Sequence, residues 1–121
     1  MKERRVAIVT TAGLHRRDDK NFDLGDLSYR AIPGDVELND LVMTQASVNY
    51  DRTGFQQDVN VVFPLDRLRE MEQRGEIGGI ANFHYAFNGA GQLVHAFEPT
   101  AREVGRMLKE DGVNAALLVP V

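Results

Sequence analysis

Two short apolar runs, one near each end of the chain, place the strongest constraint on its fold. Residues 6–9 (VAIV) and 115–119 (AALLV) contain no polar side chain. An unbroken apolar run bounded by small or turn-forming residues is typical of a parallel strand that is buried on both faces. Parallel strands are joined by crossovers, which are usually helical, so the two runs predict an α/β fold.

Further strand candidates and polar stretches lie between the two runs. Residues 28–32 and 41–44 are predicted to be strands, with a short helix or turn at 35–40 between them. The polar stretches 14–28 and 45–60 are rich in charged and turn-forming residues and are predicted to be long surface loops. The acidic residues of the first loop are interpreted as solvated: they are Asp18, Asp19, Asp23 and Asp26.

Two helices are predicted, each from an apolar stripe at helical spacing. Residues 64–74 carry one such stripe and end before Gly75, which is a stop signal. Residues 101–111 carry the second stripe. Thr100 and Glu103 match a capping box at its start, in which the hydroxyl and the carboxylate each accept a hydrogen bond from a free backbone N–H group.

A β-hairpin is predicted between these helices. Residues 80–87 alternate in the manner of a strand, and residues 92–97 form a second run that contains an aromatic residue. Asn88-Gly89 lies between them, and Asn-Gly between two such runs is a strong hairpin signal.

These patterns predict a single α/β domain over residues 1–121, with a mostly parallel, open sheet of the Rossmann or flavodoxin type and one hairpin. The sheet is predicted to be incomplete, because the strand at 115–119 is followed only by Pro120 and Val121 and not by a covering helix. The alternative is that this strand ends the fold. In open parallel sheets, ligands bind at the carboxyl ends of the strands, so a functional loop would begin after Val121.

Composition argues against several classes of function. The net charge is −4 and the isoelectric point is about 5.3, so neither nucleic acid nor an anionic membrane is an expected partner. The absence of cysteine excludes disulfides, thiolate metal sites and thiol nucleophiles within these residues, and it fits a cytoplasmic protein. No apolar run approaches the ~20 residues of a membrane span. The three histidines share no ligand spacing with a carboxylate cluster, so no metal site is predicted.

The loop after the first strand holds the first candidate site residues. Thr10, Thr11, Gly13 and His15 follow a buried strand, and small residues with free backbone N–H groups there could hold a carboxylate or a phosphate. The segment lacks both the dinucleotide-binding glycine pattern and the P-loop pattern. An ordinary strand-ending turn is the alternative interpretation.

Two further groups are candidates for the wall of a substrate pocket. Tyr50, Asp51 and Arg52 lie in one loop, where Asp51 and Arg52 either order the loop or hold a zwitterionic substrate; a solvated turn is the alternative. His84 and Tyr85 lie in the predicted hairpin, and histidine is the side chain most easily tuned for proton transfer near neutral pH. A histidine beside aromatic residues is more often a satisfied core residue.

Several segments together resemble one protein family. The most distinctive is residues 58–70, with the sequence DVNVVFPLDRLRE. The other matching segments are residues 6–15, 28–35, 50–53, 84–87 and 111–121. In this order they resemble the selenoprotein B component of the glycine, sarcosine, betaine and D-proline reductases, and the resemblance covers nearly the whole chain.

The resemblance implies reductive cleavage of a carbon–nitrogen bond in an amino acid or its N-methylated relative. It implies two partners, a subunit whose pyruvoyl group binds the substrate amine and a dithiol electron donor. In the family pattern a selenocysteine nucleophile directly follows the strand end that corresponds to Val119-Pro120-Val121. The chain is therefore expected to be the N-terminal part of a longer reductase subunit and inactive alone. No catalytic residue and no cofactor are expected within it, because the nucleophile is expected immediately after Val121. The hypothesis for the chain end is that the UGA codon of the selenocysteine was read as a stop.

Two other classes of function stay open. One is a small ligand-binding or regulatory α/β domain that is complete at 121 residues. The other is an interaction subunit whose exposed sheet edge pairs with another chain. An incomplete parallel sheet exposes apolar surface, so a homo-oligomer is expected in solution.

Overall fold

The computed structural model describes residues 1–47, 49–90 and 93–121 of the chain. Its main feature is a five-stranded sheet built around β1 (Arg5–Thr10). The other strands of this sheet are β3 (Tyr29–Pro33), β5 (Gly79–Ile80), β6 (Phe83–Phe87) and β7 (Ala115–Val119). A separate antiparallel pair is formed by β2 (Leu14–Arg16) and β4 (Leu41–Met43).

The main sheet is mostly parallel, as the sequence predicts. β5 and β6 pair with one side of β1 and β7 pairs with its other side, all parallel to it. β3 pairs antiparallel with β6 and forms the opposite edge. β1 is therefore an internal strand, and its residues Val6, Ala7 and Ile8 are buried.

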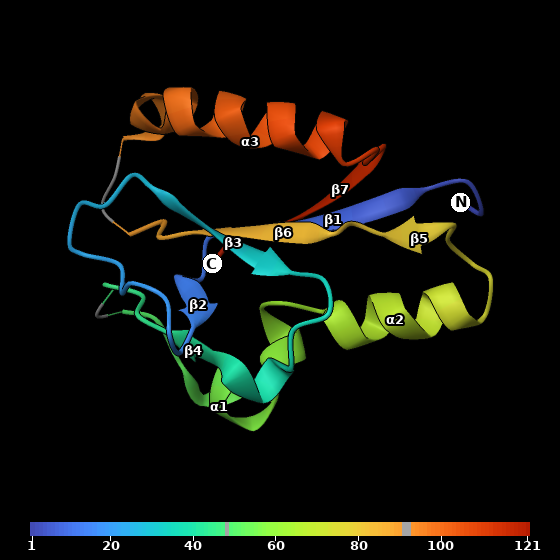
Figure 1. The fold of residues 1–121 in the computed structure, drawn as a ribbon. Helices are drawn as coiled ribbons and strands as arrows, with labels where there is room; N and C mark the ends of the chain where they lie inside the picture. Colours follow the sequence, from blue (N-terminus) through green and yellow to red (C-terminus); the bar gives the residue numbers. More distant parts are fainter. Residues whose placement is uncertain (48, 91–92) are drawn as a thin grey trace.

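Helices cover both faces of this sheet (Figure 1). α3 (Glu98–Glu110) lies on one face, and α2 (Leu65–Gln73) and α1 (Thr53–Gln57) lie on the other. The predicted helix at 64–74 is thus confirmed to within one residue, and Gly75 ends it with a φ of 72° that favours glycine. Three short 3-10 helices complete the described elements: η1 (Leu38–Asp40), η2 (Val59–Val61) and η3 (Val94–Phe97).

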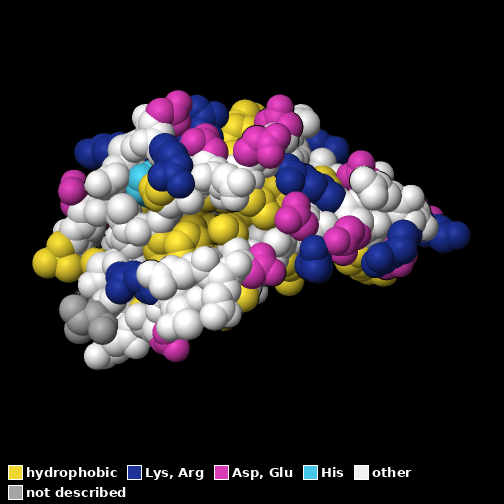
Figure 2. Space-filling model, turned by 90° about the horizontal axis from the view of Figure 1, so that it is seen from below, with side chains coloured by type: hydrophobic (Ala, Val, Ile, Leu, Met, Phe, Trp, Pro, Cys, Tyr) yellow, Lys and Arg dark blue, Asp and Glu magenta, His cyan; other side chains and the backbone are white. Residues whose placement is uncertain are grey.

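Each face of the sheet has its own hydrophobic core. The larger core lies on the α2 side and contains Ile8, Phe63 and Leu65, all fully buried. The smaller core lies under α3 and contains Tyr85 and Val104. Seen from the side that carries α2, hydrophobic side chains gather in the middle of the face and charged side chains lie around them (Figure 2).

The predicted hairpin is wrong in the part of the chain that the structure describes. The first strand is present as β6, but Val94–Phe97 form η3 instead of a second strand. Gln92, at the start of the predicted second strand, lies outside the described residues. The physical reason is that β6 has no free edge, because β1 occupies one side and β3 the other.

The predicted capping box at Thr100 is also wrong. α3 begins at Glu98, with a proline in its first turn, so Thr100 lies inside the helix. Its hydroxyl donates to the carbonyl oxygens of Leu27, at 3.0 Å, and Phe97, at 3.1 Å. Because η3 leads directly into α3, the helix starts earlier than the cap pattern indicates.

The two long surface loops contain more regular structure than predicted. Residues 14–28 include β2, whose Leu14 and His15 are buried, and residues 45–60 include α1 and part of η2. The predicted strand at 41–44 is present as β4, but it pairs with β2 and not with the main sheet.

The last strand is parallel, as predicted, but the prediction that it is buried is wrong. β7 is parallel to β1, with Val9 opposite Leu118. Leu118 is 68% exposed and Leu117 is 40% exposed. β7 lies at the edge of the sheet with β1 as its only strand neighbour among the described residues, so its outer side and much of both faces meet solvent.

Candidate functional site

The carboxyl ends of the parallel strands β1, β6 and β7 meet at one end of the sheet, with Thr11 at the centre of the junction. The Thr11 hydroxyl accepts a hydrogen bond from the Val121 N–H at 2.9 Å and donates to the Val121 carbonyl at 3.3 Å. Its backbone N–H donates to the Val119 carbonyl at 3.2 Å. The end of β7 is therefore held to the end of β1 by three hydrogen bonds from one residue.

Gln45 joins a third segment to this junction. Its side-chain N–H donates at 2.9 Å to the Thr11 carbonyl, which also accepts from the Gly89 N–H at 3.2 Å. Gln45 is only 4% exposed, and its Oε1 has no hydrogen-bond partner among the described residues. A buried acceptor without a partner is costly, so it marks a place where a further donor is expected.

Gly13 permits this close approach of the Gln45 backbone. Its φ is 70°, and a Cβ atom at this position would lie 2.9 Å from the Gln45 backbone nitrogen. Any side chain would therefore be strained by the backbone conformation and would also push the segment at Gln45 away from β1.

Two depressions flank the end of β7. The first, of about 530 Å³, is mostly apolar and includes Phe87, Phe97 and Leu118 in its lining. The second, of about 370 Å³, is more polar and includes Gln45 and Tyr50. Val121 lines both depressions, so a residue attached to it would begin between them.

The side chains that line the two depressions are suited to binding and not to proton transfer. Tyr50 is the one side chain with an ionisable group among their described residues, and burial raises its pKa. The Thr11 hydroxyl is already engaged with Val121. These groups can orient a ligand or a backbone segment, and they include no carboxylate, imidazole or amine for proton transfer.

Thr10, Thr11 and Gly13 lie at the junction, as predicted for residues that follow the first strand. Thr10 is fully buried, and its hydroxyl accepts from the Ala12 N–H at 3.2 Å, so it shapes the turn and does not line either depression. Thr11 and Gly13 hold the strand end and the neighbouring loop, respectively.

The loop at Tyr50 is brought close to the junction by Arg52. The Arg52 guanidinium donates to the Gln45 carbonyl and lies 6.0 Å from the Tyr50 ring centroid. The Asp51 carboxylate accepts from the Thr53 N–H at 2.9 Å, and the hydrogen bonds from Thr53 lower its pKa. These contacts agree with the predicted alternative in which Asp51 and Arg52 order the loop, and only Tyr50 of the three lines a depression.

His84 is a core residue and lies away from the junction. It is fully buried, and its Nδ1 accepts from the Ile8 N–H at 2.9 Å, between the places where β1 pairs with β5 and with β6. Its ring packs edge-on against Phe63, with 5.6 Å between the centroids. Burial lowers the pKa of His84 to about 4, so the imidazole is neutral at physiological pH.

Tyr85 and His15 also lie outside the junction. Tyr85 is 3% exposed and packs edge-on against Tyr29 in the core under α3, at 5.7 Å between the ring centroids; burial raises its pKa. His15 is 1% exposed on β2, with its Nδ1 2.6 Å from the Arg16 carbonyl oxygen and its ring beside Phe22. Neither side chain lines the two depressions at the end of β7.

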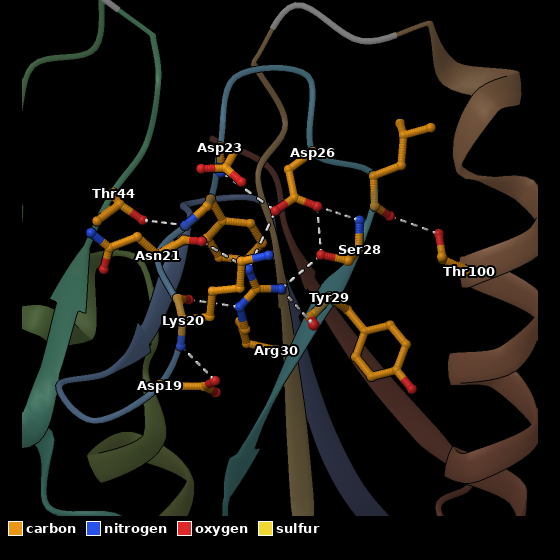
Figure 3. A network of polar contacts seen from close by, with 12 residues as sticks. Asp19, Lys20, Asn21, Asp23, Asp26, Ser28, Tyr29, Arg30, Thr44 and Thr100 are labelled. Atoms are coloured by element: carbon orange, nitrogen blue, oxygen red, sulfur yellow. Dashed lines mark hydrogen bonds and ion pairs between the residues drawn. The ribbon is translucent and has the colours of Figure 1, made fainter.

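The acidic loop is organised by Arg30, which the sequence analysis did not single out. The Arg30 guanidinium lies in the middle of the loop and 4.2 Å from the Phe22 ring centroid (Figure 3). It donates to the Lys20 carbonyl at 2.8 Å and forms an ion pair with Asp26 at 3.3 Å. The interpretation of Asp26 as a solvated residue is therefore wrong.

The environment of Asp26 explains its ionisation. Burial alone would raise its pKa, but hydrogen bonds from Ser28 and from the Asp23 N–H, together with the charge of Arg30, lower the pKa to about 2. An arginine two positions after a serine in a strand start gives no pattern from which this network could be predicted.

Gln45, Asn88 and Gly89 are the residues at the junction that sequence reasoning missed as site residues. The Gly89 backbone approaches Thr11 so closely that a Cβ atom there would lie 2.9 Å from the Thr11 Cβ. Asn88 is 1% exposed and forms an isolated β-bridge with Ala12. The Asn-Gly pair was the available signal, but it indicated a hairpin turn instead of a strand end.

The described residues contain neither a metal-binding cluster nor a membrane-spanning helix. Within residues 1–47, 49–90 and 93–121, no three His, Cys, Asp or Glu side chains are grouped so that they could hold a metal ion. Over the same residues, every helix is too short or too polar to cross a membrane.

Comparison with known proteins gives a consistent set of relatives. The sequence model for the glycine/sarcosine/betaine reductase selenoprotein B family matches residues 1–121. The D-proline reductase subunit gamma of Acetoanaerobium sticklandii is 41% identical over 120 residues, which are 98% of this chain and 49% of that protein. The sarcosine reductase complex component B subunit beta of Peptoclostridium acidaminophilum is 32% identical over 122 residues, with 98% of this chain and 28% of that protein covered.

The chain thus spans about half the length, or less, of these curated relatives. The glycine reductase complex component B subunit gamma of Carboxydothermus hydrogenoformans is a further relative, 29% identical over 117 residues, which are 93% of this chain and 27% of that protein. No solved structure matches the chain.

Proposed function

Because the chain belongs to the glycine/sarcosine/betaine reductase selenoprotein B family, we propose that it is the N-terminal part of an amino-acid reductase component. The longer component cleaves a carbon–nitrogen bond of glycine, sarcosine, betaine or D-proline. The observation that supports this role most directly is the junction at Thr11, where three strand ends meet and the end of β7 is held in place. This is where α/β sheets carry their ligands.

In this proposal the nucleophile is a selenocysteine that directly follows Val121. Reductive cleavage of a carbon–nitrogen bond takes two electrons, and a dithiol donor supplies them as it becomes a disulfide. A selenolate between a strand end and a following helix is stabilised by the positive end of the helix dipole, which lowers its pKa. A pyruvoyl group in a partner subunit would bind the amine of those substrates whose amine can react with it.

In this proposal, the residues of this chain orient the nucleophile and help to bind the substrate. Thr11 fixes the direction in which the backbone leaves Val121, and therefore the direction of the nucleophile. Gln45 and Tyr50 form one wall of the substrate pocket. The remaining walls come from the rest of the longer chain and from the partner subunit.

The test of this proposal starts with the DNA that follows the Val121 codon. We expect an in-frame TGA and a continuing reading frame with a nearby cysteine codon. A TAA or TAG without a continuing frame would contradict the proposal and would favour the alternative, a ligand-binding or subunit-interaction domain complete at 121 residues.

The activity test compares two proteins with the same four substrates. With dithiothreitol as the electron donor and the pyruvoyl-containing subunit present, the longer selenocysteine-containing chain is expected to reduce one substrate. Residues 1–121 alone are expected to reduce none. Turnover by residues 1–121 would show that the nucleophile has been assigned to the wrong place.

A further inference from the structure

We propose that the segment that follows Val121 packs into the groove beside β7 on the α3 face. In the longer chain this segment forms a helix next to α3 and leads into a strand that pairs, parallel, with the free edge of β7. The inference rests on the proposed function, since it requires the longer chain, and it assigns an occupant to a surface of the described residues.

The first observation is the side of the sheet on which β7 is uncovered. Val9 and Leu118 are opposite one another in the register of β1 and β7, so their side chains project from the same face. Val9 packs into the core under α3, which defines this face. Leu118 is nevertheless 68% exposed, because α3 does not extend over β7.

The second observation is the groove itself. It has a volume of about 530 Å³ and is lined mostly by apolar groups, including Phe87, Phe97, Ala101 and Leu118. Ala101 lies in the first turns of α3 and is exposed. A small side chain there leaves room for a second helix at close distance, and the apolar lining favours an amphipathic helix.

The third observation is the handedness of the crossovers. The connection from β6 to β7 crosses β1 with α3 on one face of the sheet, whereas α2 lies on the other face (Figure 1). Right-handed crossovers in one direction place their helices on one face of a sheet. A further crossover outward from β7 therefore places its helix on the α3 face, over Leu118.

The outer edge of β7 pairs with no strand among the described residues, so its backbone groups could pair with a further strand. The Val119 carbonyl accepts from the N–H of Thr11, the residue after β1, so the alternating backbone directs the N–H and C=O groups of Ala116 and Leu118 to the open side. An apolar edge of this kind is normally covered in a finished protein. The D-proline reductase subunit gamma is about twice as long as the matched region, which leaves enough chain for a helix and a strand.

The test measures amide hydrogen exchange in the longer chain, residue by residue along β7. We expect Ala116 and Leu118 to exchange about as slowly as Leu117 and Val119, within about tenfold, because both edges of β7 are then paired. The inner amides are the internal control. Fast exchange at Ala116 and Leu118 beside slow exchange at the other two would overturn the inference.

A charge on the apolar surface tests the helix. Leu118→Glu is expected to lower the melting temperature of the longer chain by several degrees, because the variant loses the burial of Leu118 under the helix. Leu24→Glu is the matched control, since Leu24 is 87% exposed in a loop, and no shift is expected for it. Equal, small shifts for both variants would contradict a covering helix.

A second copy of the chain is the rival occupant. If the protection of Ala116 and Leu118 disappears when the longer chain is diluted to a monomer, β7 pairs with another copy and the inference is wrong. These measurements need no substrate, so an inactive longer chain with a protected β7 would refute the proposed function alone. An active chain with an unprotected β7 would refute only this inference.

Discussion

Thr11 holds the end of β7 through a hydroxyl that both accepts from and donates to Val121. Its carbonyl accepts from Gln45 and Gly89, so one residue links segments that lie far apart in the sequence. The hydroxyl can make both hydrogen bonds to Val121 because it combines a donor and acceptor sites in one small group. The position is therefore sensitive to loss of the hydroxyl and tolerant of a smaller side chain that keeps it.

Thr11→Val tests this role at the scale of one residue. The variant keeps the branched shape but leaves the Val121 N–H without its partner, so the free energy of unfolding should fall by about 1 kcal/mol. Thr11→Ser should retain most of the stability. Urea denaturation of the three proteins measures both effects, and a Val variant as stable as the parent would show that the hydrogen bonds to Val121 contribute nothing net.

At the scale of elements, loops are positioned by single residues with specific backbone or charge properties. Gly13 allows the loop at Gln45 to lie against the end of β1, and Arg30 gathers the carbonyl groups of the acidic loop. Both loops pack beside strands of the sheet, so their order depends on contacts that are distant in sequence. Each residue has a counterpart elsewhere in the chain that serves as a control.

Gly13→Ala should be more destabilising than Gly75→Ala. Both glycines have φ near +70°, so both variants cost about 1–2 kcal/mol from backbone strain. A Cβ atom at Gly13 also meets the Gln45 backbone at 2.9 Å, whereas at Gly75 nothing lies within 4 Å. The difference between the two unfolding free energies measures the contact, and equal losses would mean that the Gln45 segment moves freely.

Arg30→Met should cost about 3 kcal/mol of stability. The arginine is 8% exposed, and its removal leaves the Asp26 carboxylate without its ion-pair partner and two loop carbonyls without this donor. Arg102→Met is the control, because its ion pair with Glu98 is exposed on α3 and should contribute less than about 1 kcal/mol. Similar losses in thermal or urea unfolding would contradict the structural role of Arg30.

At the scale of the whole molecule, two cores share one sheet, and the side chain of His84, on β6, packs against Phe63 of the larger core. Its Nδ1 accepts a hydrogen bond from the Ile8 N–H at the place on β1 between its pairing with β5 and its pairing with β6. A protonated Nδ1 could not accept this hydrogen bond. Protonation of one buried side chain therefore acts on the joint between two parts of the sheet.

The stability of the whole fold should consequently fall in mildly acidic solution. The folded pKa of His84 is lowered from 6.5 to about 4, so the unfolded chain binds more protons between these values. Stability is fully present above pH 6.5 and is lost as the pH falls toward 4, by up to about 3 kcal/mol. Urea denaturation at a series of pH values measures the slope.

His84→Gln should remove this slope, and His95→Gln, at an exposed position, should keep it. A slope that is unchanged in His84→Gln would assign the pH dependence to other groups. The low pKa of Asp26, about 2, places its own contribution below this window, since its stabilisation is lost only as the pH falls from 3.8 toward 2.

Local sequence patterns were sufficient for the elements whose signal lies within one segment. The apolar runs predicted two parallel strands, which are β1 and β7, although not that they pair with each other. The apolar stripe and Gly75 predicted α2, and the strand-end position of Thr10, Thr11 and Gly13 was correct. The resemblance to the family was also visible in the residues alone. These features depend on hydrophobic periodicity and backbone preference, which act between near neighbours.

Tertiary structure decided the features that depend on which edges and faces are already occupied. β6 could not form a hairpin because β1 and β3 fill its two sides, and β7 is exposed because no described element covers it. His84 and Tyr85 became core residues, while Gln45 entered the site from a distant loop. The sequence by itself determined the two apolar strands, the helix at α2 and the family; the packing of distant segments determined which side chains meet at the end of β7.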